Sequence, residues 1–379
     1  MPSPRRAATS PEPLLIAAVT ARPLAASARR GGFAAAVLDL FADADTRALG
    51  YPCRNVCRGD ALRFDPKRLL AAADELAPAG RCAGVVLGSG FEAHTRLMAR
   101  LAADRRLLGN SPETVAAVKD PARFFPLLER LGIPHPETRL ARPADPALWL
   151  AKRRGGAGGT HVAAASRAGR GRDVYYQRFV AGRSLSALFL ADGRRALVVG
   201  WNEQWSAGPA TPFLYGGGMG GAALPPPLEA EIAAALDRIV AQAGLAGLNG
   251  LDFIAGDRGW HAIEINPRPT AALEYYDADW PRGLLAAHIA ACEGALPAAR
   301  PPAAALRGHA IVFAARPVAV RPGLRFPAWC RDVPNPGTLI PAGGPVCTAH
   351  AEAADAEKLR RLIAGRQSEI QWLLRNEAA

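Results

Sequence analysis

The stretch that most constrains the fold is Leu248–Thr270, which reads LNGLDFIAGDRGWHAIEINPRPT. Two apolar runs flank a short polar turn that contains glycine, and this pattern is typical of a β-hairpin. We take Asp257–Gly259 as a three-residue loop in which Gly259 supplies a positive φ. Gly256 is then expected to pair with Trp260, and this register fixes the partner of every other residue in the hairpin.

The register brings oxygen-bearing side chains together on one face. Asp252 falls opposite Glu264, and Asn266 shares their face because side chains alternate along a strand. Opposed carboxylates with Cβ atoms about 5 Å apart repel each other. A hard divalent cation such as Mg²⁺ would remove this repulsion by binding to both, so the pair is a candidate metal site. Arg268 can meet an anion beside the metal. The alternative is that Asp252 and Glu264 are ordinary solvated strand residues.

The composition excludes several classes of protein. The chain has 379 residues, half of them hydrophobic, which is enough for two or three domains. No stretch approaches 18 apolar residues, so no membrane-spanning helix is expected. The apolar run at 14–19 is too short for a secretory signal, and we expect a cytoplasmic protein with a flexible tail at residues 1–12. Cys53 and Cys57 lack the second pair that a zinc site needs, so reduced cysteines are expected.

The formal net charge of +12 permits nucleic-acid binding, but the charge is spread along the chain. No RNA-binding motif with interleaved aromatic residues appears, so no nucleic-acid partner is expected. Nearly all basic residues are arginine, and the lysines are Lys67, Lys119, Lys152 and Lys358. A lysine in such a chain can indicate a position where a compact point charge is needed.

Strands and helices alternate in roughly the first 110 residues, which predicts a parallel α/β domain. Loops at the carboxyl ends of such strands carry ligands, so Gly88–Gly90 is a candidate substrate edge, with a plain tight turn as the alternative. The predicted elements are strands at 13–20, 33–40 and 84–88 and helices at 24–30 and 66–76.

The next segment carries two lysines at positions suited to anions. Ser111 opens a helix with good capping chemistry, and a second helix follows, so Lys119 lies at a helix entrance. Lys152 ends the strand predicted at 147–153, just before the glycine loop 155–159. This loop lacks the ending of a P-loop and opens no helix, but its backbone N–H groups can fold over phosphates. A mobile hairpin tip has the same pattern.

Further along, strands at 184–190 and 195–201 are predicted to form an antiparallel pair. Pro209–Leu224 is interpreted as a long glycine-rich loop, and such loops inside a compact domain are usually functional. His161 and His261, placed in strands, and His288, on an apolar helix face, are interpreted as structural. The other predicted elements are strands at 160–165 and 173–180, helices at 121–131, 228–243 and 283–292, a linker at 294–305 and a final helix at 351–374.

The order of these features resembles the ATP-grasp superfamily over roughly residues 14–290. A lysine before a helix comes first, and a lysine on a strand before a glycine loop follows. The hinge strand QRFVAG comes next, and DF and EINPR come last. The resemblance implies an α/β and α+β fold, in which an N-terminal parallel α/β domain precedes a two-lobed ATP-grasp fold with antiparallel sheets. The implied segments are the tail 1–12, the N-terminal domain 13–111, the small lobe with the nucleotide hinge 112–184, the large lobe with the metal site 185–300 and a C-terminal segment 301–379.

The resemblance also implies roles for single residues. ATP phosphates would be held by Lys119 and Lys152, and a developing acyl-phosphate would be stabilised by Arg268. One or two Mg²⁺ ions, with Mn²⁺ as the alternative, would be bound by Asp252, Glu264 and Asn266. The adenine pocket would be lined by Gln177, Arg178, Phe179 and Val180. Many family members have an acid that holds the ribose hydroxyls where this chain has Ser184, so the ribose contact departs from the family pattern. The hinge also often has an acid at position 177 or 178, where this chain has Gln177 and Arg178.

Finer features resemble one branch of the superfamily. SARRGGF, VVLGSGFE, LLGNSPE, GWNEQW and NPRPTAALEYYD look like ATP-grasp ligases similar to archaeal tyramine–glutamate ligase of methanofuran synthesis. This resemblance implies a ligase that joins glutamate to an amine through an acyl-phosphate, in the biosynthesis of a methanofuran-type one-carbon cofactor. Trp205, Tyr215 and Gly216–Gly221 are candidates to face the second substrate.

Two other functions stay open at this point. One is another ATP-grasp phosphotransferase or carboxylase, and the other is a non-catalytic nucleotide-binding regulator. The sequence names neither the acid nor the amine, and it does not give the oligomeric state, although dimers are common in the superfamily.

Overall fold

An apolar N-terminal segment forms a parallel sheet in the computed structural model, which describes residues 11–59, 61–168, 171, 173–257 and 259–376. Most of the expected tail, residues 1–10, lies outside the described residues. Every residue of the two central strands β1 and β2 is buried, as in parallel sheets covered on both faces. The predicted parallel α/β domain is confirmed. The sheet has the order β3-β2-β1-β6, with β1 (Leu14–Ala18), β2 (Ala35–Asp39), β3 (Cys53–Asn55) and β6 (Gly84–Leu87).

Helices cover this sheet, and local capping fixes where they begin. The side chain of Asp65 accepts hydrogen bonds from the backbone N–H groups of Lys67 and Arg68, so α3 begins at the predicted residue. The elements around the sheet are α1 (Arg22–Arg30), α2 (Ala44–Arg47), α3 (Pro66–Leu76) and α4 (Thr95–Ala102), with a small hairpin of β4 (Cys57–Arg58) and β5 (Ala61–Phe64).

Two capped helices lead into a small antiparallel sheet. The Ser111 hydroxyl accepts from the N–H of Thr114, and the Asp120 carboxylate accepts from the N–H of Ala122, so each helix begins where the sequence predicts. Lys119 is the last residue of the first of these helices. The elements are α5 (Pro112–Lys119), α6 (Pro121–Arg130), β7 (Thr138–Arg139), β8 (Trp149–Arg153), β9 (Val162–Ala164) and β10 (Val174–Arg178), and the sheet order is β7-β10-β8-β9.

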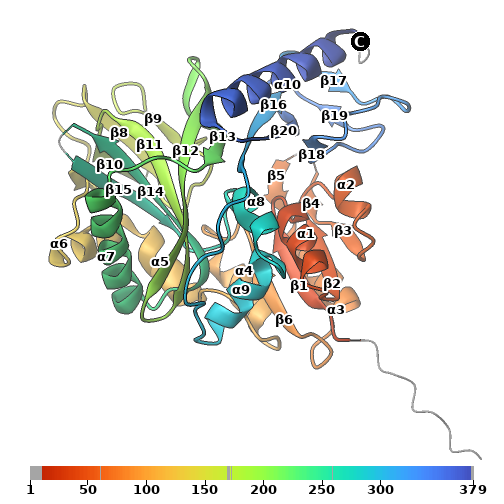
Figure 1. Ribbon diagram of the computed structural model, residues 1–379, viewed down its shortest axis with the longest axis horizontal. Coiled ribbons are helices and arrows are strands. Elements are labelled where there is room, and N and C mark those ends of the chain that lie inside the picture. The colour runs from red at the N-terminus through yellow and green to blue at the C-terminus, as the bar shows by residue number, and fades with distance from the viewer. Residues whose placement is uncertain (1–10, 60, 169–170, 172, 258, 377–379) are drawn as a thin grey trace, which may run out of the picture.

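A large antiparallel sheet organises the rest of the chain (Figure 1). Its order is β15-β14-β11-β12-β13-β16-β20-β18. The strands are β11 (Arg183–Asp192), β12 (Ala196–Gly208), β13 (Thr211–Gly220), β14 (Ala246–Gly256), β15 (Gly259–Asn266), β16 (Leu306–Phe313), β18 (Cys330–Arg331) and β20 (Pro345–Ala353). The remaining elements are α7 (Pro226–Ala243), α8 (Leu273–Tyr276), a 3₁₀ turn (Asp277–Asp279), α9 (Gly283–Cys292), the pair β17 (Val318–Ala319) and β19 (Leu339–Ile340), and α10 (Ala356–Asn376).

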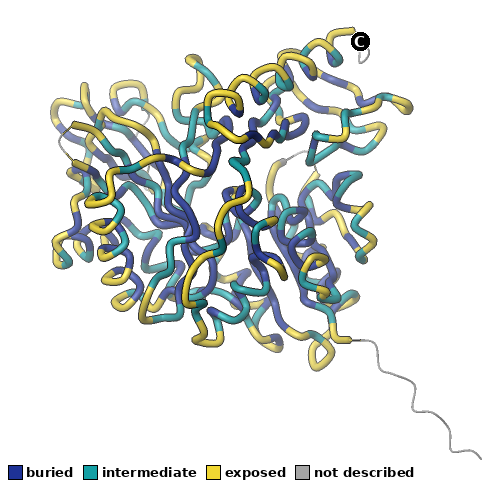
Figure 2. The backbone as a smooth tube through the Cα atoms, in the orientation of Figure 1, coloured by how far each residue is buried: buried dark blue, intermediate teal, exposed yellow. Residues whose placement is uncertain are grey.

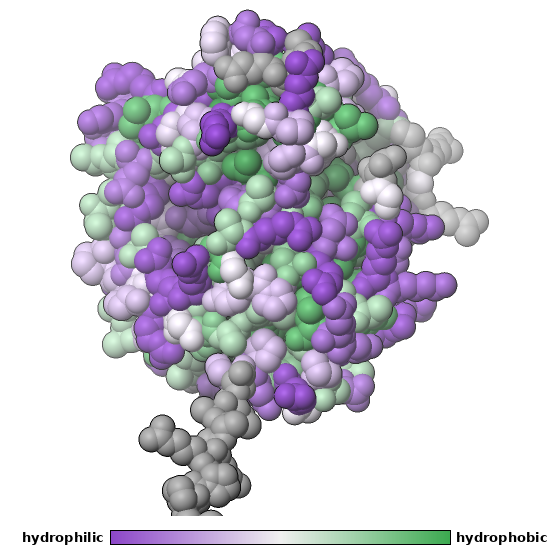
Figure 3. Space-filling view, turned by 90° about the vertical axis from the view of Figure 1, so that its right-hand side faces the viewer, coloured by the Kyte–Doolittle hydropathy of each residue, from purple (hydrophilic) through white to green (hydrophobic). Residues whose placement is uncertain are grey.

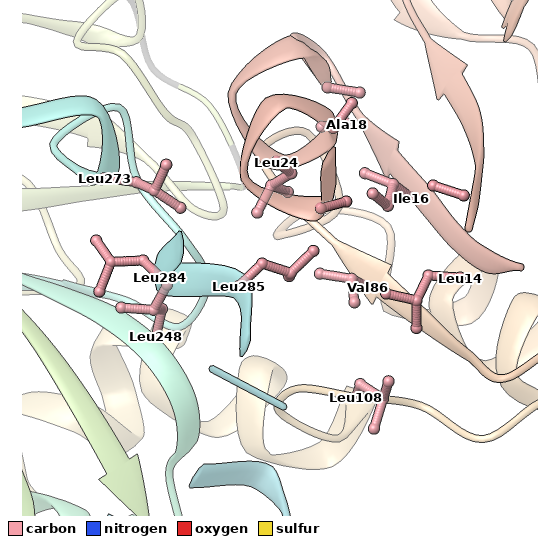
Figure 4. Close-up of a cluster of buried hydrophobic side chains, with 14 of the residues drawn as sticks. Leu14, Ile16, Ala18, Leu24, Val86, Leu108, Leu248, Leu273, Leu284 and Leu285 are labelled. Atoms are coloured by element: carbon pink, nitrogen blue, oxygen red, sulfur yellow. The ribbon is translucent and has the colours of Figure 1, made fainter. Parts of the chain in front are cut away.

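Strand β11 is buried on both faces and joins two cores. Phe189 faces the core under α7, whereas Leu188 and Leu190 face the core shared with α9 and the N-terminal domain. This alternation follows from the period of two along a strand. In Figure 2 the strands of the large sheet form a buried centre. Figure 4 shows the second core, in which apolar side chains of α1, β1 and β6 meet leucines of β14, α8 and α9.

The segment interpreted as a long glycine-rich loop is a strand, and that prediction was wrong. Its glycines permit close packing. A Cβ on Gly217 would lie 2.3 Å from the carbonyl oxygen of His309, and one on Gly220 would lie 2.9 Å from the Tyr276 hydroxyl. Glycine in a strand can mark the close approach of a neighbour, and here the neighbours are strand β16 and a tyrosine ring.

The central hairpin differs from the predicted register at its tip. Gly256 pairs with Gly259 instead of Trp260, so the loop is one residue shorter than expected, while Gly259 has the expected positive φ of 100°. A β-bulge follows before Glu264 and inserts one residue into β15. The bulge offsets the shorter loop, and Asp252 therefore stands opposite Glu264 as predicted.

Two further predictions were wrong in their bounds. The final helix begins at Ala356, because residues up to Ala353 pair with β16 as strand β20. His161 lies in a turn just before β9, whereas His261 lies in strand β15 as predicted. Strands of the C-terminal segment extend the large sheet, so β16, β20 and β18 share one sheet with β11 to β15.

His288 is structural, as predicted. It is 1% exposed on α9, its Nδ1 accepts from the N–H of Leu248 at 2.8 Å, and its Nε2 lies 3.0 Å from the carbonyl oxygen of Leu108. Its two ring nitrogens thus join α9 to β14 and to the N-terminal domain. Burial lowers the pKa of His288 from 6.5 to about 4.

This pKa shift predicts a loss of stability in acid. The unfolded chain binds a proton at His288 more tightly than the folded chain. The contribution of neutral His288 to the free energy of unfolding is therefore complete above pH 6.5 and is lost as the pH falls toward 4. The loss is about 3 kcal/mol. Urea unfolding at a series of pH values gives the free energy of unfolding as a function of pH. The slope of this curve between pH 4 and 6.5 should be shallower for His288→Gln than for the wild type, while His94→Gln, at an exposed position, should keep the wild-type slope. Equal slopes for all three proteins would contradict the assignment.

Among the described residues, every helix is too short or too polar to span a bilayer. Hydrophilic and hydrophobic residues are interspersed on the face shown in Figure 3.

Candidate active site

The structure brings the three predicted metal ligands together on strands β14 and β15. Asp252 pairs with Glu264 across the hairpin, and the side-chain amide of Asn266 donates to Asp252 Oδ2 at 2.9 Å. Gln204 on β12 donates to the other oxygen, Asp252 Oδ1, at 3.0 Å. Gln204 was not among the predicted site residues, although it lies in the GWNEQW motif, because the strand pairing that brings β12 beside β14 is not local.

The two predicted phosphate-binding lysines reach the same region from the small lobe. Lys119 Nζ lies 3.0 Å from Glu264 Oε2, and its side chain is 6% exposed. Lys152 is buried, and its Nζ donates to Gln177 Oε1 at 2.7 Å. Burial lowers the pKa of Lys152, while the charges of Glu264 and Asp252 act in the opposite direction. Both lysines therefore lie in the field of Glu264, and Lys152 also lies in the field of Asp252.

The two carboxylates differ in the ease with which they ionise. Burial and the charge of Glu264 raise the pKa of Asp252 to about 7. Burial also acts to raise the pKa of Glu264, but Lys119 and Lys152 outweigh it and lower this pKa to about 2. Glu264 thus ionises more readily than Asp252, whose carboxyl group binds a proton more tightly. A dication that accepts oxygen ligands would displace that proton, so the donor set fits Mg²⁺ or Mn²⁺.

Arg268 lies beside this group and is held by a residue of the N-terminal domain. Its Nε donates to Glu92, and its Nη2 lies 3.5 Å from Asn266 Oδ1. The other oxygen of Glu92 accepts from the N–H of Gly90 at 2.8 Å. Burial acts to raise the pKa of Glu92, yet Arg268 and Lys119 lower it overall. The predicted substrate edge after β6 therefore meets the predicted catalytic arginine, and Glu92, quoted only as part of that loop, is the residue that joins them.

A pocket lies between α5, α6, the glycine loop and β15. Its lining includes Lys119, Gly155, Gly156, His161 and Glu264. A Cβ on Gly156 would lie 2.2 Å from the imidazole of His161, so glycine is required where the loop crosses this ring. His161 was interpreted as structural, but it faces this pocket. Its buried Nδ1 has no hydrogen-bond partner among the described residues.

The glycine loop is joined to strand β13. The N–H of Tyr215 donates to the carbonyl oxygen of Gly158 at 3.0 Å, and a Cβ on Gly159 would lie 1.6 Å from the carbonyl oxygen of Phe213. The loop therefore lies over the side of the site where Tyr215 was predicted to face a substrate. Trp205 lies on β12 and packs against the core between β13 and α10.

The predicted hinge residues follow one another along the end of β10. Gln177 is buried, and its side chain joins Lys152 to Thr138. The N–H of Arg178 donates to Glu137 and the N–H of Phe179 donates to Leu148, both at 2.8 Å, so neither N–H is free for an adenine ring. Contacts from these two residues would have to come from their carbonyl groups or side chains, and the Phe179 ring is 49% exposed. Val180 is half-buried beside them, and Ser184 is exposed at the start of β11.

Comparison with known families identifies the central part of the chain. Residues 118–272 match the profile of a family described as ATP-grasp domain. Over these residues the chain is similar to an ATP-grasp domain. The matched stretch contains both lysines, the hinge, the carboxylates and Arg268.

Curated relatives of the ATP-grasp domain include carbamoyl phosphate synthase large chains. The chain is 27% identical over 222 residues to that of Deinococcus deserti, covering 51% of this chain and 21% of the relative. It is 28% identical over 240 residues to that of Deinococcus radiodurans, covering 55% and 23%. The chain thus spans about a fifth of the length of these curated relatives.

Solved structures extend the likeness beyond the domain. N5-carboxyaminoimidazole synthase from Aspergillus clavatus, in complex with ADP and 5-aminoimidazole ribonucleotide, has a TM-score of 0.68 and 13% identity, covering 95% of this chain and 99% of that one. Biotin carboxylase from Campylobacter jejuni has a TM-score of 0.70 and 16% identity, covering 91% and 88%. At such identities the likeness shows a shared fold, and the predicted ATP-grasp fold is confirmed.

Proposed function

We propose that this protein is an ATP-dependent ligase that joins a carboxylate to an amine. One observation carries the proposal: Asp252, Glu264 and Asn266 lie together, with Lys119 on Glu264 and Arg268 beside Asn266. Phosphoryl transfer needs positioning and charge neutralisation more than covalent help. Two lysines, an arginine and an oxygen-rich metal site supply these in one place.

The reaction has two steps. A carboxylate oxygen of the acid attacks the γ-phosphorus of ATP, the bond to the β-phosphate oxygen breaks, and ADP leaves with an acyl-phosphate as the product. The amine nitrogen then attacks the acyl carbon, inorganic phosphate leaves, and the nitrogen loses a proton. A bound Mg²⁺ would neutralise charge on the phosphates. Lys119 and Lys152 orient them, and Arg268, held by Glu92, stabilises the acyl-phosphate.

The finer assignment is glutamate as the acid and a tyramine-like amine, in synthesis of a methanofuran-type cofactor. It is supported by the motifs of the N-terminal domain, by GWNEQW and by NPRPTAALEYYD. The excess of basic residues suits an anionic acid. We also propose that the protein is a cytoplasmic homodimer. Its chain would be divided into the five segments that the resemblance implies. One structural neighbour, the biotin carboxylase domain of Hydrogenobacter thermophilus 2-oxoglutarate carboxylase, is a dimer. Light scattering after gel filtration measures the assembly.

A carboxylase is the second candidate, and the structural neighbours favour it. Biotin carboxylase is among them, and the Hydrogenobacter neighbour was solved with MgADP and bicarbonate. In that case bicarbonate replaces the organic acid in the first step. A nucleotide-binding regulator is the third candidate, and it would bind ATP without turnover.

One assay separates the three candidates. Purified protein is incubated with MgATP, and ADP is measured with glutamate, tyramine, tyrosine or bicarbonate alone and with each acid combined with each amine. We expect ADP only when an organic acid and an amine are both present, with a matching amide mass in the product. Turnover that requires bicarbonate would identify a carboxylase, and binding of ATP without ADP release would identify a regulator.

Lys152→Met should weaken nucleotide binding about tenfold to a hundredfold, because a charge-assisted hydrogen bond contributes roughly 1.5–3 kcal/mol. Calorimetric titration with ADP and with adenosine measures the change. A phosphate contact predicts a loss for ADP only, whereas a structural role through Gln177 would weaken both ligands. Lys67→Met, on the exposed face of α3, is the matched control and should bind as the wild type does. Unchanged ADP affinity in Lys152→Met would contradict the phosphate role.

A further inference from the structure

A second cluster of metal-ligating side chains lies outside the ATP-binding site. It consists of Glu274 on α8, His309 on β16 and His350 on β20, each offering one donor atom within 4.8 Å of the others. His350 Nε2 lies 3.7 Å from Glu274 Oε2. These elements meet where the C-terminal strands continue the large sheet, above α8 in Figure 1. The three residues are 35 to 76 positions apart in the sequence, so no motif indicates them.

Two ring nitrogens of the cluster are buried without a partner. Among the described residues, neither His309 Nδ1 nor His350 Nε2 has a hydrogen-bond partner, and His309 is 2% exposed. A buried polar atom left unsatisfied costs roughly 1–3 kcal/mol. The other nitrogen of His309, Nε2, lies 3.1 Å from the Tyr215 hydroxyl. The ring is therefore held at Nε2, while Nδ1 is left for a ligand.

The charge around the cluster is unbalanced. Arg22 is a cation at its edge, and its guanidinium lies within 3.5 Å of the carboxylates of Glu274, Asp332 and Asp45. Three carboxylates share this one guanidinium. Both oxygens of Glu274 accept from Arg22 at 2.8 Å, but a carboxylate has about four lone-pair sites and keeps two for another ligand.

We propose that Glu274, His309 and His350 form a binding site for a transition-metal dication of the Zn²⁺ class. Two imidazoles and one carboxylate are a donor set that zinc sites use, and the set leaves one position for water or another ligand. In a tetrahedral site with bonds of about 2.0–2.2 Å, neighbouring donors lie roughly 3.4 Å apart. The separation of His350 from Glu274 is already close to this value.

The site joins three parts of the chain and reaches toward the ATP-binding residues. Coordination at His309 Nδ1 fixes the proton on Nε2, so that Nε2–H donates to the Tyr215 oxygen. Tyr215 carries the N–H that holds the glycine loop. The inferred metal is thus one side chain removed from the residues that the sequence analysis placed near the second substrate. The inference does not depend on the ligase activity.

Metal analysis of the full chain, expressed without a histidine tag, tests this inference. The protein is dialysed against EDTA, loaded with one equivalent of Zn²⁺ and desalted, and its zinc content is measured. Co²⁺ is added in a parallel experiment for its visible spectrum. We expect about one retained Zn²⁺ per chain and a tetrahedral Co²⁺ spectrum for the wild type. His350→Gln, a side chain that is 20% exposed, should lose both.

Two controls separate this site from others. Asp252→Asn, which changes the predicted magnesium site, should retain the zinc. Circular dichroism and thermal melting in EDTA should be the same for His350→Gln and the wild type, so that metal loss is not a loss of fold. The inference is overturned if the wild type retains no more zinc than His350→Gln, or if the zinc of the wild type is lost in Asp252→Asn.

Discussion

Glu264→Gln is expected to lower turnover by at least about 100- to 1000-fold while the protein remains folded. The substitution removes the charge that faces Asp252 and Lys119, and loss of one electrostatic group at a reacting centre typically costs this much in rate. A neutral amide is also a weak ligand for a hard dication. ADP release is the first readout. Binding of a non-hydrolysable ATP analogue with and without Mg²⁺ is the second, and its Mg²⁺ dependence should disappear.

Glu203→Gln is the matched control for this prediction. Glu203 precedes Gln204 on β12, so it points to the opposite face, where it pairs with the exposed Arg360. It should keep wild-type turnover. Glu264→Gln also leaves Lys119 without its partner, so its thermal melt must be recorded. A folded variant with turnover within tenfold of the wild type would refute the metal assignment.

Arg22→Met is expected to lower the free energy of unfolding by about 3–5 kcal/mol, because it removes a buried cation and leaves the partly buried carboxylates around it without a partner. Arg22 is 5% exposed at the start of α1 and contacts Glu274, Asp332 and Asp45. The pKa of Glu274 agrees with this magnitude. Burial acts to raise it, but Arg22 lowers it from 4.5 to about 2. That shift amounts to about 3 kcal/mol, present above pH 4.5 and lost as the pH falls toward 2.

Arg30→Met, on the same helix, is the control for Arg22→Met. Arg30 is 45% exposed and lies 3.0 Å from Asp277, and such a pair contributes at most about 1 kcal/mol. Both variants are unfolded with urea in EDTA, so that no bound dication compensates for the missing guanidinium. Equal destabilisation of the two variants would show that the carboxylates around Arg22 do not depend on its charge.

Much of the site was predictable because its signals are local. The alternation of the hairpin placed Asp252, Glu264 and Asn266 on one face, and the helix caps placed Lys119 at a junction of two helices. Two local errors, a loop one residue too long and an unforeseen β-bulge, offset each other at Asp252. The glycines of β13 were misinterpreted because a glycine that permits a close contact looks the same in the sequence as one that permits a turn.

The sequence by itself determined the strands and helices, the lysine and carboxylate positions and the superfamily they resemble, because period-two alternation, capping and loop composition are properties of neighbouring residues. The tertiary structure alone decided that Glu92 holds Arg268, that Gln204 holds Asp252, and that two histidines and Glu274 meet beside Arg22. These contacts join residues up to 252 positions apart. Their pairing is set by the order of strands in the sheet and by the packing between the parts of the chain, which no local pattern records.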